Sequence, residues 1–219
     1  MNTIRKSERT TIHRLPKLGS YDRELIHGII DLTTLCHVGF VHEGAPVVIP
    51  CLHGREGDML YFHGSRMSRL MQALVSGSEI CAVFTLFNGL VMARAAFAHS
   101  AQYESVIAYG TGFDIPEPDS KLRALKAISD HLFPGRWEDV RPPTEQELAA
   151  TCVAGITVTD ASAKISAEGP QDRPGDMDWP AWAGVIPAQF SYGPPQQDPS
   201  QNSSIPFPEY LRQLLPVGS

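Results

Sequence analysis

The chain of 219 residues lacks several patterns that would fix its class at once. Its first twenty residues contain no apolar stretch of the kind that a secretory signal peptide needs. The longest apolar run, Ile80 to Phe87, falls far short of the roughly 20 residues of a membrane-spanning helix. No GxGxxG or phosphate-binding-loop pattern follows a strand, so the standard nucleotide folds have no support. We therefore expect a cytoplasmic protein that does not bind a membrane.

The sequence has only four cysteines, and its eight histidines show no regular spacing. The four cysteines contain no CxxC pair, which favours reduced thiols in the core of a cytosolic protein. Cys51 and His53 share a strand face, with His63 one strand later, but no HxxxH or HExxH accompanies them. No metal site is predicted on this spacing. A nucleophilic Cys–His pair has no residue that would orient its base.

Charge is unevenly distributed although the net charge is only −6 and the pI about 5.7. This balance excludes the global basic surface typical of nucleic-acid-binding proteins. Six of the first 23 residues are basic, whereas ten of the 18 prolines stand at position 170 or later, in an acidic region. We predict a single domain over residues 1–192 with an N-terminal arm. A Pro-rich extension over 193–219 follows and ends in a short helix.

From Cys36 onward the sequence pattern changes to that of short strands. Runs over 36–41, 47–52 and 59–63, joined by turns that contain glycine, predict an antiparallel meander. Pro46 and Pro50 cannot donate to a ladder. They indicate either an edge strand or a strand whose backbone serves a ligand, and both interpretations stay open.

The later part of the chain also predicts strands, joined by turns and short helices. Asn88-Gly89 between two apolar runs predicts a tight hairpin. A helix over 120–132 should turn Lys121 outward, and Thr144 opens a capping box for another short helix. Together with strands over 103–110, 153–159 and 163–166, these elements favour one mostly antiparallel barrel.

Two segments carry candidate binding chemistry. Residues 61–69 run from a strand end through Gly64 into a helix start, and supply hydroxyls and two guanidiniums suited to a phosphate. The alternative is a solvated basic loop. Residues 179–190 hold two tryptophans, which either cap a planar ligand or subunit boundary, or simply close the core.

Four segments in this order carry a family resemblance: VGFVHEGAPVVIPCLHGREGDMLYFHGSRMSRLMQAL, HSAQYESVIAYGTG, ITVTDASAKISA and WAGVIP. The chain resembles the FMN-binding split-barrel proteins related to pyridoxamine 5′-phosphate oxidase. Within them it is most similar to the nitroimidazole-reductase (Nim-type) branch. The resemblance implies a mainly β fold, a six-stranded antiparallel split β-barrel with short helices. It also implies a homodimer with one flavin in each subunit-boundary cleft.

The resemblance implies a set of site residues. His63 is the candidate catalytic residue, and Trp182 matches the C-terminal aromatic near the flavin or the partner subunit. The second strand offers its backbone to the ring edge, and the strand-to-helix element holds the phosphate. The implied flavin-binding residues are Ile49, Pro50, Cys51, Leu52, Phe62, His63, Gly64, Ser65, Ser68, Arg69 and Trp182.

Two departures argue against oxidation of pyridoxamine phosphate itself. Leu70 stands where the oxidase has a basic residue, and Glu104 replaces the arginine of its Tyr-Arg-Ser-Val strand. We therefore expect an oxidoreductase that uses FMN, with FAD as the alternative, and that acts on a small aromatic or nitro compound. The competing hypothesis is a non-catalytic flavin- or haem-binding carrier or sensor. A third hypothesis is an interaction protein that uses the basic N-terminal arm.

Overall fold

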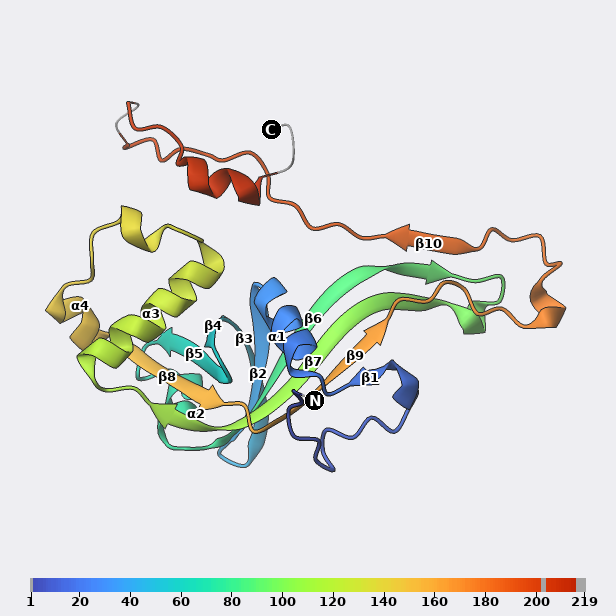
Figure 1. Cartoon of the computed structure of the whole chain (residues 1–219), viewed down its shortest axis with the longest axis horizontal. Helices are drawn as coiled ribbons and strands as arrows, with labels where there is room; N and C mark the ends of the chain where they lie inside the picture. Colours follow the sequence, from blue (N-terminus) through green and yellow to red (C-terminus); the bar gives the residue numbers. More distant parts are fainter. Residues whose placement is uncertain (1, 202–203, 216–219) are drawn as a thin grey trace.

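The computed structural model describes residues 2–201 and 204–215 (Figure 1). Ten strands in this part of the chain pair antiparallel: β1 (Gly19–Ser20), β2 (Leu35–His42), β3 (Ala45–Leu52), β4 (Gly54–Glu56), β5 (Met59–Gly64), β6 (Glu79–Met92), β7 (Ser100–Asp114), β8 (Cys152–Thr157), β9 (Asp160–Ser166) and β10 (Gly184–Pro187). The α-helices are α1 (Arg23–Leu32), α2 (Arg69–Val75), α3 (Pro118–Leu132) and α4 (Glu145–Ala150). Short 3-10 helices are η1 (Pro16–Leu18), η2 (Ala96–Ala98), η3 (Trp137–Asp139), η4 (Pro174–Asp176) and η5 (Glu209–Leu214).

The strands form an open, split barrel. The main order is β3-β2-β6-β7-β8-β5-β4, and β9 pairs with β7 on the side that carries β1. Strand β7 joins the two parts, because residues 103–109 pair with β9 whereas 112–114 pair with β8. The predicted fold class is confirmed. The expected number of six strands is too low, because short pairings such as β1–β9, β4–β5 and β6–β10 extend the sheet at its margins.

The hairpin expected at Asn88-Gly89 is wrong. Strand β6 continues through both residues, with a register shift between Phe87 and Gly89, and the turn comes after Met92. A Cβ at Gly89 would lie 2.7 Å from the carbonyl oxygen of Ile186 in β10. The glycine therefore permits close approach of a third strand instead of a tight turn.

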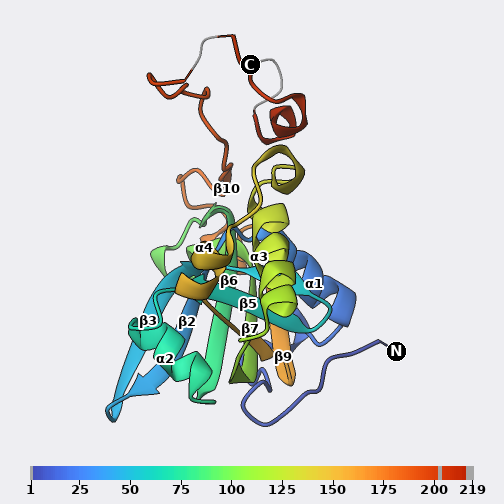
Figure 2. The ribbon, with the colours of Figure 1, turned by 90° about the vertical axis from the view of Figure 1, so that its left-hand side faces the viewer.

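One core fills the barrel and a second lies under α3. Helix α1, capped by Asp22 accepting from the backbone N–H of Leu25 at 2.9 Å, faces the main core with its isoleucines. Tyr61, Ala124 and Ile128 belong to the smaller core between α3 and the sheet. Figure 2 shows α3 lying across this side of the sheet.

Lys121 corrects the expected orientation of α3. Its side chain is buried rather than outward, and Nζ donates to the carbonyl oxygens of Leu148 and Thr151, each at 2.9 Å. These carbonyls lie at the end of α4, where the helix leaves its last acceptors without intrahelical donors. A cation suits this position because it satisfies the carbonyls and the negative helix end together. Lys121 thereby ties α4 to α3.

The basic N-terminal arm is engaged within the chain. Arg9 donates through Nε and Nη2 to the two carboxylate oxygens of Asp160, both at 2.8 Å, and stacks 4.2 Å over the ring of Tyr109. The hydrogen bond from Arg9 lowers the pKa of Asp160 well below its usual range. Further along the arm, Lys17 pairs with Glu168. These contacts account for several of the charges that the third hypothesis reserved for a partner.

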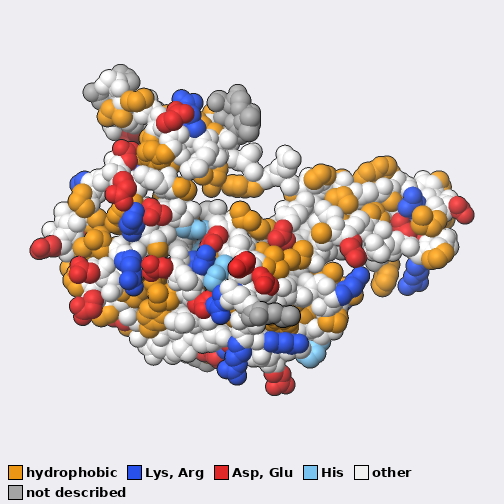
Figure 3. Space-filling view, in the orientation of Figure 1, with side chains coloured by type: hydrophobic (Ala, Val, Ile, Leu, Met, Phe, Trp, Pro, Cys, Tyr) orange, Lys and Arg blue, Asp and Glu red, His pale blue; other side chains and the backbone are white. Residues whose placement is uncertain are grey.

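The distal parts of β6 and β7 form an extension that projects from the barrel, and β10 pairs along its β6 side, from Gly89 to Met92 (Figure 1). Figure 3 shows hydrophobic side chains spread over this extension. Phe97, in η2 between β6 and β7, is 90% exposed, and Trp182, just before β10, is 64% exposed. Within residues 2–201 and 204–215, no helix is long and apolar enough to span a membrane.

Candidate functional site

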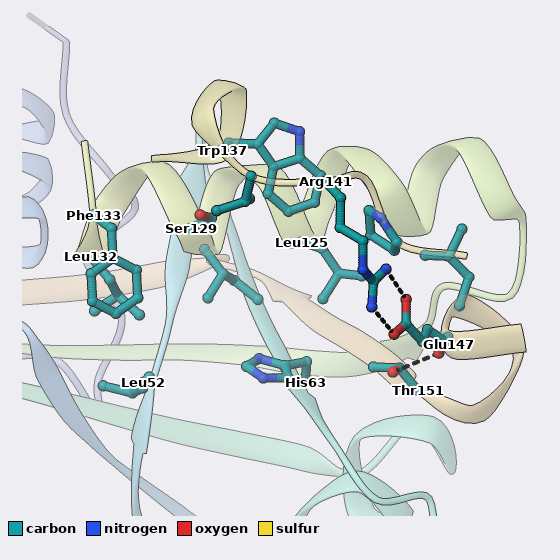
Figure 4. A pocket seen from close by; sticks show the side chains of 14 residues that line it. Leu52, His63, Leu125, Ser129, Leu132, Phe133, Trp137, Arg141, Glu147 and Thr151 are labelled. Atoms are coloured by element: carbon teal, nitrogen blue, oxygen red, sulfur yellow. Dashed lines mark hydrogen bonds and ion pairs between the residues drawn. The ribbon is translucent and has the colours of Figure 1, made fainter. Parts of the chain in front are cut away.

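A cavity of about 620 Å³ lies between α3 and the ends of β3 and β5 (Figure 4). Helix α3 supplies one apolar wall, and the segment from η3 to α4 supplies the other. Apolar side chains lining it include Leu52, Leu125, Ile128, Leu132, Trp137 and Val140. A few polar groups interrupt them: His63, Ser129, Arg141, Glu147 and Thr151. An apolar hollow with a few convergent polar groups is the usual form of a small-molecule site.

His63 stands on the sheet side of this cavity, between Leu52 and Thr151 in the view of Figure 4. It follows Phe62 on β5, and the alternation of the strand places Phe62 in the core and His63 toward the cavity. Burial lowers the pKa of His63 below its ordinary 6.5. The lowered pKa favours the neutral imidazole, which has a nitrogen lone pair available to a ligand.

An ion pair closes the opposite side of the cavity. Arg141 donates to both carboxylate oxygens of Glu147, at 2.6 and 2.8 Å. The same carboxylate completes the expected capping box by accepting from the backbone N–H of Thr144 at 2.8 Å. The hydrogen bonds from Arg141 lower the pKa of Glu147 to about 2. This pair was missed in the sequence analysis, although the capping box marked Glu147 as a fixed carboxylate.

Strand β3 is an edge strand whose two faces differ. It pairs with β2 and has no second strand partner among the described residues, which confirms the edge interpretation of Pro46 and Pro50. Ile49 and Cys51 pack against the core, whereas Pro50 and Leu52 face outward. The outer edge therefore leaves backbone donors and acceptors at alternate residues open to a ligand.

Hydroxyl groups and one guanidinium follow His63 directly. Ser65 Oγ accepts from the backbone N–H of Met67 at 3.3 Å, and Ser68 Oγ caps α2 by accepting from Met71 at 3.3 Å. Because each oxygen already accepts locally, each O–H is left to donate outward. Arg69 is exposed and has no ion-pair or hydrogen-bond partner in the described part of the chain.

The neighbouring arginine behaves differently. Arg66, which the sequence offered as a second phosphate ligand, donates to the carboxylate of Asp114 at 3.0 and 3.3 Å. Arg69 is thus the guanidinium of this segment that is available for an anion. Gly64, the last residue of β5, connects this segment to His63.

The predicted site residues are only partly brought together within one chain. Leu52 and His63 line the same cavity, and Ser65 to Arg69 continue directly from His63. Trp182 instead precedes β10, whose first residue, Gly184, pairs with Met92 at the far end of β6 (Figure 1). Within one chain it is remote from the cavity.

Comparisons place these features beside known proteins. The sequence matches the family described as Pyridoxamine 5'-phosphate oxidase over residues 22–165. Among solved structures it is similar to the flavocytochrome Anf3 from Azotobacter vinelandii, with 38% identity, a TM-score of 0.89 and coverage of 95% of this chain and 97% of that one. It is also similar to the FAD and heme binding protein from Mycobacterium smegmatis, with 34% identity, a TM-score of 0.86 and coverage of 90% and 97%.

A more distant similarity is to a candidate 5-nitroimidazole antibiotic resistance protein from Bacteroides thetaiotaomicron. The identity is 25%, the TM-score is 0.58, and the alignment covers 67% of this chain and 86% of that one. No curated protein matches the sequence.

Proposed function

The chain belongs to the pyridoxamine 5′-phosphate oxidase family, and from that premise we propose that it binds a flavin and acts as an oxidoreductase on a small aromatic or nitro compound. The observation that carries the proposal is the set of uncommitted donors after His63. Ser65 and Ser68 have hydroxyl hydrogens to offer, and Arg69 has no counterion among the described residues. Hydroxyl and guanidinium donors in one short segment fit a phosphate ester.

The outer edge of β3 fits the other end of a flavin. Ile49, Cys51 and Leu52 have backbone N–H groups, whereas Pro50 has none. Because only alternate residues of an edge strand turn their backbone groups outward, the donors toward a ring are either Ile49 and Cys51 or Leu52. Fixed backbone donors along a ring edge stabilise negative charge without reorganisation. A bound flavin would supply hydride or single-electron transfer, and the protein would supply position and electrostatics.

The residues above serve FMN and FAD equally, because both carry the same ring and the same 5′-phosphate. FMN is the flavin expected from the sequence. The name of the Mycobacterium smegmatis relative refers to FAD, which favours FAD as the flavin to test beside it.

The cavity is suited to the substrate we propose. Its walls are apolar, and about 620 Å³ lies in the range of small-molecule pockets. His63 would orient a bound compound by donating or accepting a hydrogen bond. Its lowered pKa makes this neutral role a better fit than that of a cationic acid. The antibiotic-resistance relative supports a nitro-aromatic compound as the class to test first.

A second copy of the chain would complete the flavin site. Val41 and Val48, on β2 and β3, are 65% and 64% exposed, and an apolar surface of this kind fits a covered interface. Trp182 lies far from the cavity in its own chain, so it would approach a flavin only across a subunit boundary. These two observations support the proposed homodimer.

We predict that Arg69→Ala weakens the affinity for flavin by about 10- to 150-fold. Loss of a charge-assisted hydrogen bond costs about 1.5–3 kcal/mol, which converts to this range. Titration of the flavin-free protein with FMN and with FAD, followed by flavin fluorescence, measures the change.

Arg66→Ala is the matched control, because Arg66 is already paired with Asp114. Its flavin affinity should stay within about threefold of that of the wild type, since an exposed ion pair contributes little. Equal affinity in the Arg69 variant and wild type would remove Arg69 from the site. Failure of the wild type to bind either flavin would overturn the proposed function.

A second candidate function, haem binding, is favoured by the cavity itself. An apolar slot with a neutral imidazole on one side fits a planar macrocycle and offers a lone pair to its iron. Two relatives support this candidate by name, one as a flavocytochrome and the other as an FAD and heme binding protein. Haem in the cavity is compatible with a flavin held by the phosphate segment, because the two use different side chains, but it would take the place of the proposed substrate beside His63.

If the cavity takes haem, His63→Ala should weaken haem affinity at least about tenfold, since the iron loses a ligand worth more than about 1.4 kcal/mol. Absorbance titration with haemin would follow binding in wild type and variant. The control is His13→Ala, at an exposed position of the N-terminal arm. Unchanged binding in the His63 variant would show that His63 is not a ligand.

A further inference from the structure

Cys36 and Cys51 face each other across two neighbouring strands. They are direct register partners in the β2–β3 pair, and their sulfur atoms are 3.8 Å apart. The Cys36 thiol also lies 3.4 Å from the carbonyl oxygen of Cys51, as a donor. Cys81 and Cys152, on β6 and β8, have no other cysteine sulfur within hydrogen-bond distance in the described part of the chain.

The backbone already provides the spacing that a disulfide requires. Directly opposite residues in an antiparallel pair have Cα atoms about 4.5 or 5.5 Å apart, depending on the type of pair. Disulfides span Cα separations of about 4.4–6.8 Å. A bond between Cys36 and Cys51 therefore needs side-chain rotation and no movement of either strand.

We propose that Cys36 and Cys51 form a reversible disulfide site, which takes low-molecular-weight disulfides as its oxidants. The two thiols have different exposure, and this gives them different roles. Cys51 is half-buried on an edge strand and keeps part of its surface accessible, whereas Cys36 is fully buried. The hydrogen bond to Cys51 and burial raise the pKa of Cys36, which makes it the poorer attacking thiol.

Oxidised glutathione illustrates the exchange. The Cys51 thiolate attacks one glutathione sulfur, which forms a mixed disulfide and releases the first glutathione thiolate. The Cys36 thiol then loses its proton and attacks the Cys51 sulfur, which releases the second glutathione. In sum, two electrons and two protons pass from the cysteines to two glutathione molecules. Reduced glutathione reverses the same steps.

A disulfide between Cys36 and Cys51 would lie close to the cavity. A disulfide would cross-link β2 to β3 one residue before Leu52, which lines the cavity. The inference itself rests on strand register and sulfur geometry, and does not depend on the proposed function.

Purified full-length protein equilibrated in mixtures of oxidised and reduced glutathione tests the proposal. After an acid quench and alkylation, cleavage with an endoproteinase that cuts after glutamate separates the two cysteines at Glu43; trypsin would leave both in one peptide, since no Lys or Arg lies between Arg23 and Arg55. We expect a Cys36–Cys51 linked peptide that grows with the oxidised fraction and disappears on return to reduced glutathione. Cys81 and Cys152 should remain alkylated.

Two variants test the order of the steps. Cys36→Ala should trap the glutathione adduct on Cys51, whereas Cys51→Ala should leave Cys36 alkylated at every ratio. Cys152→Ala should form the Cys36–Cys51 bond like the wild type. A wild type that carries only a glutathione adduct, links other cysteines or stays fully alkylated at all ratios would overturn the proposal.

Discussion

Gly54→Ala is expected to lower the free energy of unfolding by about 3 kcal/mol, because an added Cβ overpacks a backbone-to-backbone contact. The Cβ would lie 2.5 Å from the backbone nitrogen of Ile128 and 2.7 Å from the carbonyl carbon of Ala127. These atoms belong to the middle of α3, so the clash is relieved only if the whole helix moves away from β4. Denaturation with urea measures the loss.

Gly28→Ala is the matched control within the same protein. Gly28 lies inside α1, and nothing stands within 4 Å of the Cβ that the substitution adds. Alanine should therefore stabilise the fold by up to about 1 kcal/mol through helix propensity. The two substitutions add the same methyl group with opposite expected signs. Equal effects would contradict the role of Gly54 as the contact point of α3.

The Gly54 variant should also alter ligand binding. Helix α3 contributes one wall of the cavity through Leu125 and Ile128, so a displaced helix changes the shape of the cavity. Any ligand of the cavity should bind the variant more weakly, while the phosphate segment beyond His63 stays intact.

The second large effect concerns pH and His53. This side chain is fully buried and contacts Phe84 edge-to-face, with ring centroids 4.9 Å apart. Its Nε2 lies 3.3 Å from the carbonyl oxygen of Ile30 and donates to it, so Nδ1 carries the lone pair. Nδ1 has no hydrogen-bond partner among the described residues. Burial, with the nearby His131, lowers the pKa of His53 to about 4.

A lowered histidine pKa gives stability a definite pH dependence. Between about pH 6.5 and 4 the unfolded chain binds a proton at His53 that the folded chain does not bind. The free energy of unfolding should therefore fall as the pH decreases through this window, by about 3 kcal/mol in total. Asp160, whose pKa is lowered, contributes in a separate window below its ordinary value of 3.8.

His53→Phe should flatten this dependence, because a ring is retained and the titrating group is removed. The carbonyl of Ile30 keeps its bond from the backbone N–H of Thr33 at 3.1 Å, so no acceptor is stranded. Urea denaturation at a series of pH values compares wild type, His53→Phe and the exposed control His13→Phe. A variant whose stability falls between pH 6.5 and 4 as steeply as that of the wild type would assign the effect to other groups.

The β meander was predictable because its information is local. The runs over 36–41, 47–52 and 59–63 are short and largely apolar, and the turns between them contain glycine. Pro46 and Pro50 also identified the edge of the sheet correctly, since a residue without an N–H is excluded from a ladder on both sides.

The failures came from contacts between distant segments. Asn88-Gly89 has the composition of a turn, yet a glycine is needed at position 89 because the backbone of Ile186, almost 100 residues later, packs closely against it. Lys121 stands at a helix position that the sequence pattern predicts to be exposed, yet its Nζ donates to carbonyl oxygens at the end of α4. The sequence around a residue does not predict where such a distant partner will lie.

In the candidate site, too, the continuous segment was predictable and the part assembled from distant segments was not. The segment from His63 to Arg69 is continuous in sequence, so its donors were predictable as a group. The cavity joins α3, η3 and α4 to β5. Arg141 was missed because no sequence pattern connects it with Glu147, six residues later, and because only the fold places His63 opposite this pair. The far position of Trp182 likewise depends on how β10 pairs with β6.

The contacts of the N-terminal arm set an order of assembly. Arg9 and Lys17 each bind a residue 151 positions further along the chain, on or just after β9. During synthesis Arg9 and Lys17 are made before strands β2 to β8, and their partners only after these strands. Because closing so long a loop costs chain entropy, we expect these contacts to form late in folding. Substitutions at Arg9 or Asp160 should therefore raise the rate of unfolding and leave the rate of folding nearly unchanged.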